Sequence, residues 1–244
     1  MLQLHHICKT YTTGTFTQVA LDDVSVSFRD NEFVAILGPS GSGKTTLLNI
    51  VGGLDHYDSG DLVIDGISTE QYKDRDWDAY RNNRIGFVFQ SYNLIPHQTV
   101  LSNVELALTL SGVSRAERRK RALDALGRVG LAEHVNKKPS QLSGGQMQRV
   151  AIARMLMQDT PIKIFDDSLS AVDMETDAKI RESINKNVRG TTIIIAHRIT
   201  TIMNADQIIV MDGGKIAAVG THDELMKTSD IYRDVYESQQ KGVA

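Results

Sequence analysis

Short apolar runs, separated by segments with helical periodicity, occur along most of the chain. Five of these runs are rich in β-branched residues and have the length of buried strands: residues 33–37, 85–89, 162–165, 192–196 and 207–211. Because both faces of such strands are apolar, the pattern indicates a mostly parallel sheet covered by helices on both sides. Residues 24–28 and 62–66 instead alternate apolar and polar positions, as half-buried strands do. We therefore expect an α/β fold.

Residues 91–160 have a different pattern, without a convincing strand. Residues 100–110 and 115–129 have helical periodicity, and Ser114 with Glu117 predicts a capping box at the start of the second helix. The spacing predicts one apolar face on this helix, made of Ala122, Leu123, Leu126 and Val129. We therefore expect a helical subdomain over residues 91–160, inserted between residues 1–90 and 161–244.

The last part of the chain returns to strands and helices. Asp212-Gly213-Gly214 predicts a hairpin that leads into a strand over residues 215–219. Thr221 and Glu224 form a second predicted capping box, and residues 231–240 have the pattern of a polar helix.

The composition excludes several classes of protein. The 244 residues include a single cysteine, Cys8, so no disulfide within the chain is possible. The net charge is −3, which provides no basic field for nucleic acid, and we expect no nucleic-acid partner. No apolar run approaches the ~20 residues of a transmembrane helix, and the N-terminus lacks the apolar segment of a signal peptide.

One glycine-rich segment carries the chemistry of a phosphate site. Residues 38–45 fit the pattern G-x-x-x-x-G-K-[ST], directly after a predicted strand and before a helical run. Its backbone N–H groups and the helix N-terminus attract phosphate, while Lys44 adds a point charge and Thr45 a hydroxyl ligand for Mg²⁺. The residues that we expect to bind the phosphates are Gly38, Ser40, Gly41, Ser42, Gly43, Lys44, Thr45 and Thr46.

Two carboxylates follow the predicted strand at residues 162–165. A carboxylate that leaves a buried strand beside a phosphate loop holds Mg²⁺, often through water, and we assign this role to Asp166. Asp167 then stands where a base polarises the attacking water.

The motif Leu142-Ser143-Gly144-Gly145-Gln146 distinguishes among phosphate-loop proteins. It resembles the signature of ABC-type ATPases, and the resemblance covers nearly the whole chain. Tyr11 matches the aromatic residue that stacks on adenine, and Gln90 the glutamine that joins Mg²⁺ to the helical subdomain. Residues 170–173, ending at Asp173, match the dimer-contact loop, and His197 matches the switch histidine.

The resemblance implies a P-loop NTPase fold with a mostly parallel core sheet, an N-terminal antiparallel β subdomain and an inserted helical subdomain, all within one ABC ATPase domain over residues 1–244. Ser143 would cap the helix through residues 147–156. In the family, ATP binds between the phosphate loop of one subunit and this helix N-terminus of another. Ser143, Gly145, Gln146 and Asp173 would make that contact.

The same resemblance implies the reaction and the partners. Water would attack ATP in line, with Asp167 and His197 assisting, Lys44 stabilising charge, and Thr45, Gln90 and Asp166 holding Mg²⁺. The expected partners are a second ABC ATPase subunit, in a homodimer or a heterodimer, and a transmembrane permease that keeps the chain at the inner face of the cell membrane.

Two features depart from the family pattern. The family carries glutamate where this chain has Asp167, and the side chain is shorter by one methylene, so we expect slow hydrolysis. In addition, the first ~150 residues resemble ATPases of lipoprotein-release and macrolide-efflux systems. The remainder resembles the degenerate-site ATPase domain of heterodimeric ABC exporters. A chimera, joined between about Arg149 and Pro161, is one interpretation, and drift within one lineage is the other.

Three other functions remain open on the sequence. A P-loop nucleotide kinase would need a lid and an acceptor site, and Ser143-Gly144-Gly145-Gln146 argues against it. A DNA-repair or translation ABC protein would need insertions for which 244 residues leave no room. A non-hydrolysing dimerisation module gated by ATP would use the same motifs.

Overall fold

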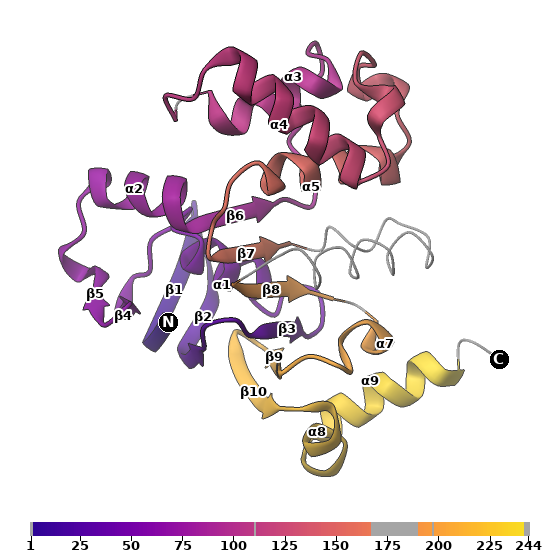
Figure 1. Ribbon diagram of the computed structural model, residues 1–244. Helices are drawn as coiled ribbons and strands as arrows, with labels where there is room; N and C mark the ends of the chain where they lie inside the picture. The colour runs from indigo at the N-terminus through magenta and orange to yellow at the C-terminus, as the bar shows by residue number, and fades with distance from the viewer. Residues whose placement is uncertain (1, 110, 167–189, 197, 242–244) are drawn as a thin grey trace. The chain divides into compact units, whose positions relative to one another are not determined.

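The computed structural model describes residues 2–109, 111–166, 190–196 and 198–241 (Figure 1). The chain divides into two compact units, and each is described by itself. The first consists of Met1–Ile85 with Gly190–Ala244, and the second of Gly86–Arg189.

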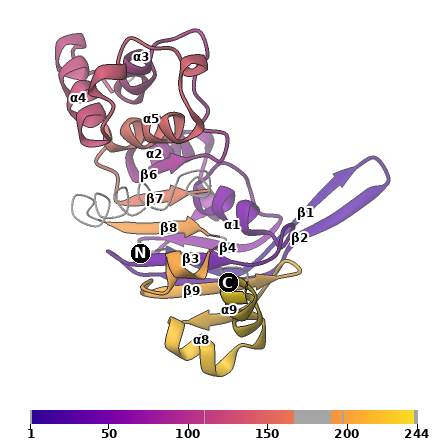
Figure 2. The ribbon, with the colours of Figure 1, turned by 90° about the vertical axis from the view of Figure 1, so that its right-hand side faces the viewer.

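An antiparallel sheet begins the first unit. Strands β1 (Leu2–Thr13) and β2 (Phe16–Phe28) form a long hairpin, and the sheet continues through β4 (Ser59–Ile64) to β5 (Ile67–Ser68) in the order β2-β1-β4-β5. Figure 2 shows the far ends of β1 and β2 projecting beyond the other strands of this sheet. The expected N-terminal antiparallel subdomain is confirmed, and its strands extend well beyond the alternating segments seen in the sequence.

A second group of strands in the first unit has the order β10-β9-β3-β8. Strand β3 (Phe33–Leu37) pairs in parallel with both β8 (Thr191–Ile195) and β9 (Gln207–Asp212), and a hairpin adds β10 (Lys215–Gly220) in antiparallel orientation. The side chains of β3 from Val34 to Leu37 are at most 3% exposed. The predicted parallel core strands are therefore confirmed.

Helices and short helical turns complete the first unit. Their bounds are α1 (Lys44–Val51), η1 (Thr69–Gln71), α2 (Asp74–Arg84), α7 (Ile199–Ile202), α8 (His222–Thr228) and α9 (Asp230–Lys241). The backbone N–H of Thr221 donates to Glu224 Oε2 at 2.8 Å, which confirms the predicted capping box of α8. Helix α2 was not predicted from the sequence, because it is largely polar and buries only Trp77 and Tyr80.

The second unit is mostly helical. Strand β6 (Ile85–Val88), at its start, neighbours β7 (Ile162–Phe165). Between these strands lie α3 (Val100–Glu105), η2 (Leu106–Leu108), α4 (Arg115–Arg128), η3 (Ala132–His134), η4 (Pro139–Gln141) and α5 (Gly144–Leu156).

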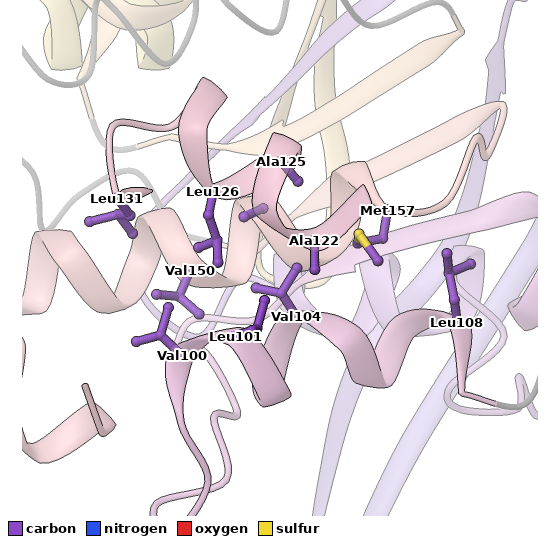
Figure 3. Packing of buried hydrophobic residues seen from close by; sticks show 11 residues of the cluster. Val100, Leu101, Val104, Leu108, Ala122, Ala125, Leu126, Leu131, Val150 and Met157 are labelled. Carbon is purple, nitrogen blue, oxygen red and sulfur yellow. The ribbon is translucent and has the colours of Figure 1, made fainter. Parts of the chain in front are cut away.

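Helices α3, α4 and α5 share one apolar core, and Figure 3 shows Val104, Ala122 and Leu126 within it. Ala122 and Leu126 are fully buried, as their spacing predicts. The placement of Leu123 on the same face was wrong, since this side chain is 41% exposed. One step along a helix turns the side chain by about 100°, which carries Leu123 away from the core.

Among the helices of the described ranges, none has both the length and the apolar character needed to cross a membrane.

Candidate functional site

The phosphate loop connects β3 to α1 through a backbone that only glycine accommodates easily. Gly43 precedes the first turn of α1 with φ 94°, and Gly38 leaves β3 with φ 157°. A Cβ atom at Gly38 would collide with the carbonyl oxygen of Met211, and one at Gly43 would collide with that of Ala20. The loop is therefore packed tightly against its own unit, which gives the phosphate cradle a fixed shape.

Lys44, the first residue of α1, lies inside this cradle. Its side chain is only 8% exposed, and Nζ donates to the carbonyl oxygens of Gly38 at 2.9 Å and Pro39 at 2.7 Å. The ammonium group is thus held against the loop from which it would reach a phosphate. The hydroxyl oxygen of Ser42 is buried and has no hydrogen-bond partner within the described residues. A ligand oxygen in the cradle would provide one.

Tyr11 meets the end of this loop through its hydroxyl group. The hydroxyl donates to Asp55 Oδ2 at 2.6 Å, and the side chain of Thr46 in α1 lies near enough to affect its pKa. Partial burial and the bond to Asp55 raise the pKa of Tyr11, while the Thr46 side chain opposes them. The structure therefore brings together two predicted nucleotide-binding residues, Tyr11 and Thr46. Sequence reasoning missed Asp55, which belongs to no recognisable motif.

The predicted signature motif opens helix α5 in the second unit. Ser143 is the N-cap, and its Oγ accepts from the backbone N–H of Gln146 at 3.3 Å, while Gln146 Oε1 accepts from the N–H of Ser143 at 2.9 Å. This reciprocal capping box confirms the helix start predicted at Ser143. The helix N-terminus carries a partial positive charge that favours an anion.

His134 supports this motif from η3. Its Nε2 lies 3.1 Å from Nε2 of Gln146, a contact that sequence reasoning missed because His134 shows no recognisable spacing. The other ring nitrogen of His134 is buried without a hydrogen-bond partner in the described part of the chain.

The two predicted Mg²⁺ residues of the second unit lie at adjoining strand ends. The backbone N–H of Asp166, directly after β7, donates to the carbonyl of Val88 at 3.0 Å, and Gln90 follows Val88 by two residues. Asp166 is 6% exposed. From α5, Arg154 donates to the carbonyl oxygens of Tyr92 at 2.7 Å and Asn93 at 2.8 Å, which ties the segment after Gln90 to the helix of the signature motif. Burial lowers the pKa of Arg154.

Three predicted site residues, Asp167, Asp173 and His197, lie outside the described residues. Among the described residues, no group of three or more histidine, cysteine or acidic side chains is arranged to hold a metal ion by itself.

Comparison with known proteins places this geometry in context. The sequence profile of the ABC transporter family matches residues 21–170. The ABC transporter ATP-binding protein MJ0796 of Methanocaldococcus jannaschii is 42% identical over 223 residues, covering 88% of this chain and 95% of that protein. The macrolide export ATP-binding/permease protein MacB of Burkholderia pseudomallei is 39% identical over 88% of this chain, which spans only 33% of MacB.

A solved structure of MJ0796 shares the fold. It describes a dimeric, post-hydrolysis state bound to ADP and Pi, and it matches 91% of this chain and 99% of its own with a TM-score of 0.85 and 41% identity. The expected P-loop NTPase fold is thereby confirmed.

Proposed function

Because this chain belongs to the ABC transporter family and is an ABC-type ATPase, we propose that it binds ATP with Mg²⁺ and pairs head-to-tail with a second ABC ATPase subunit. Binding closes the pair and hydrolysis opens it, and this cycle drives a transmembrane permease. The dimeric state of the related MJ0796 supports the pairing.

The observation that carries the proposal is the presence of two different anion-binding helix starts on one chain. Helix α1 follows a rigid glycine cradle with Lys44 inside it, and α5 starts at the Ser143 capping box. In a head-to-tail pair, α1 of one subunit and α5 of the other would bind the same triphosphate. Gly145, Gln146 and Asp173 would complete the contact from the side of α5.

The residues of the cradle suit a triphosphate. The buried Ser42 hydroxyl, which has no hydrogen-bond partner among the described residues, offers a polar group to a phosphate oxygen. The close packing of Gly38 and Gly43 fixes the shape of the loop around it. Thr45, Gln90 and Asp166 offer hydroxyl, amide and carboxylate oxygens, which are the donors that Mg²⁺ prefers. When bound, Mg²⁺ would neutralise charge on the phosphates, as Lys44 does from the protein.

We assign the hydrolytic step to Asp167 and His197, as the family resemblance implies. The carboxylate of Asp167 ends roughly 1.3 Å short of the position that glutamate would reach, and a misplacement of ~1 Å can cost ~100-fold in rate. We therefore propose a slow ATPase. A module that dimerises on ATP without hydrolysing it is the alternative that this substitution favours.

The permease would provide the membrane location. The name of MacB describes it as both an ATP-binding protein and a permease, and this chain spans 33% of its length. We propose that a transmembrane partner holds the chain at the inner face of the membrane, and that residues 90–104 receive it. The chimera interpretation stays a hypothesis, and under it partner choice would follow the first ~150 residues.

The test is phosphate release by the purified chain with Mg²⁺-ATP, measured across protein concentration. A rate that rises with the square of concentration, and is lost in Lys44→Ala, is expected for an active dimer. Size-exclusion chromatography with ATP and with ADP distinguishes the alternative, because a non-hydrolysing module would dimerise without releasing phosphate. A rate that rises strictly linearly down to low concentration, with no dimer in ATP, would contradict the proposal.

A further inference from the structure

The carboxylate of Asp55 joins the loop after α1 to strand β1. Asp55 accepts three hydrogen bonds with its two oxygens: from the Tyr11 hydroxyl at 2.6 Å, from Lys9 Nζ at 3.0 Å and from the backbone N–H of His56 at 2.7 Å. Partial burial alone would raise the pKa of Asp55, but these bonds lower it below its ordinary value. The carboxylate is therefore charged and held in one orientation at neutral pH.

Further contacts around Asp55 fix strand β1 at the two residues that precede Tyr11. Lys9 is 12% exposed at its side chain, donates also to the carbonyl of His56 at 2.6 Å, and lies over the Tyr11 ring at 5.1 Å from the centroid. In addition, Asp58 Oδ2 accepts from the backbone N–H of Thr10 at 2.6 Å. The loop thus binds the two residues before Tyr11 and the Tyr11 hydroxyl, while Lys9 contacts the ring.

These contacts order the exposed ring of Tyr11 before any ligand binds. Tyr11 is 40% exposed and stands on a projecting hairpin, where a side chain would ordinarily sample several rotamers. Its hydroxyl is anchored by Asp55 and lies near the Thr46 side chain at the start of α1. A ring held in place binds a flat ligand without the free-energy cost of ordering the side chain.

We propose that Asp55 is a positioning residue for recognition of the nucleotide base. By fixing the Tyr11 ring beside the phosphate cradle, it sets the affinity for the base while leaving the affinity for the phosphates unchanged. This inference rests on the proposed function, in which Tyr11 meets the adenine of ATP.

The experiment separates the base from the phosphates. Calorimetric titrations with ATP and with inorganic tripolyphosphate, which lacks the base, compare the intact protein with Asp55→Ala, Tyr11→Phe and the double variant. The loss of one hydrogen bond of ordinary net strength predicts about a three- to tenfold weaker affinity for ATP in each single variant. We expect unchanged affinity for tripolyphosphate, and no further loss in the double variant, since both substitutions remove the same bond.

Asp78→Asn is the matched control, because Asp78 is exposed and its ion pair with Arg81 lies within α2. Tyr11→Phe also keeps the inference testable if Asp55→Ala folds poorly, because this variant retains the aromatic ring and loses only the hydroxyl. Equal losses for ATP and tripolyphosphate, unchanged ATP affinity, or additive losses in the double variant would overturn the inference. If the intact protein binds neither ligand, the proposed function itself fails.

Discussion

His134 and Gln146 are joined by a hydrogen bond between side chains, with 3.1 Å between their Nε2 atoms. The amide nitrogen of Gln146 can only donate, so Nε2 of His134 is the acceptor in this arrangement. The amide oxygen of Gln146 accepts at the same time from Ser143, the N-cap of α5. His134 therefore orients the side chain that closes the capping box of the signature motif.

The first prediction concerns this contact. His134→Ala should weaken ATP-dependent dimerisation about three- to tenfold, the range expected for one hydrogen bond, because Gln146 loses its fixed orientation. Nucleotide affinity of the monomer should not change, since the phosphate loop belongs to the first unit. Analytical ultracentrifugation with a slowly hydrolysed ATP analogue measures the dimerisation. Calorimetry measures the nucleotide affinity. His97→Ala, at an exposed position of the same unit, is the control.

The second prediction compares two glycines of the phosphate loop. Gly41 and Gly43 both have positive φ, 79° and 94°, but a Cβ at Gly41 meets no atom within 4 Å whereas one at Gly43 collides with Ala20. Gly41→Ala should cost about 1 kcal/mol of folding free energy from backbone strain alone. Gly43→Ala should cost several kcal/mol, because the collision adds to similar strain. Urea unfolding of both variants checks this order, and equal costs would contradict it.

The third prediction compares two leucines of helix α4, one buried and one exposed. Leu126 is fully buried in the core of the helical unit, while Leu123 is 41% exposed. Leu126→Ala should lower the free energy of unfolding by about 2–5 kcal/mol, because it removes buried methyl groups and leaves a cavity. Leu123→Ala should change it by less than about 1 kcal/mol. Circular dichroism during urea unfolding measures both, and a large loss at Leu123 would show that its side chain is packed.

The fourth prediction is a dependence of stability on pH. The pKa of Asp55 is lower in the folded protein than its ordinary value of about 4, so the folded state favours the charged form. The charged carboxylate therefore contributes to folding stability fully above about pH 4, and this contribution is lost as the pH falls through the pKa of the folded state. Asp55→Asn should therefore be less stable than the intact protein at pH 7, and the difference should shrink below pH 4.

Trp77 provides the signal for that measurement. It is the single tryptophan of the chain, is 5% exposed, and lies 5.8 Å from the ring of His56, next to Asp55. Its fluorescence therefore follows unfolding of the first unit. A stability difference between Asp55→Asn and the intact protein that stays constant from pH 7 to pH 3 would contradict the prediction.

The fifth prediction concerns the shortened carboxylate. Asp167→Glu should raise steady-state ATP turnover by about 10- to 100-fold, because the longer side chain restores roughly 1 Å of reach toward the attacking water. The affinity for ATP should stay the same, since this residue acts on the chemical step. Equal turnover in the two proteins would remove the idea that Asp167 slows hydrolysis.

The sequence by itself determined the features whose chemistry is local. The apolar runs predicted the core strands, and the glycine pattern before Lys44 predicted a strand, a loop and a helix in that order. The start of α5 was equally predictable, because Ser143 and Gln146 stand three residues apart and satisfy each other's backbone groups. Such features depend on a few neighbouring residues, so their spacing carries the information.

Only the tertiary structure decided which distant side chains meet. Asp55 lies 44 residues from Tyr11, and His134 lies 12 from Gln146, and neither pair has a spacing that marks it. Helix α2 escaped prediction since two buried aromatic residues hold a largely polar segment in place. In each case the free energy comes from contacts that exist only once the chain is packed, and no local pattern of hydrophobic and polar residues records them.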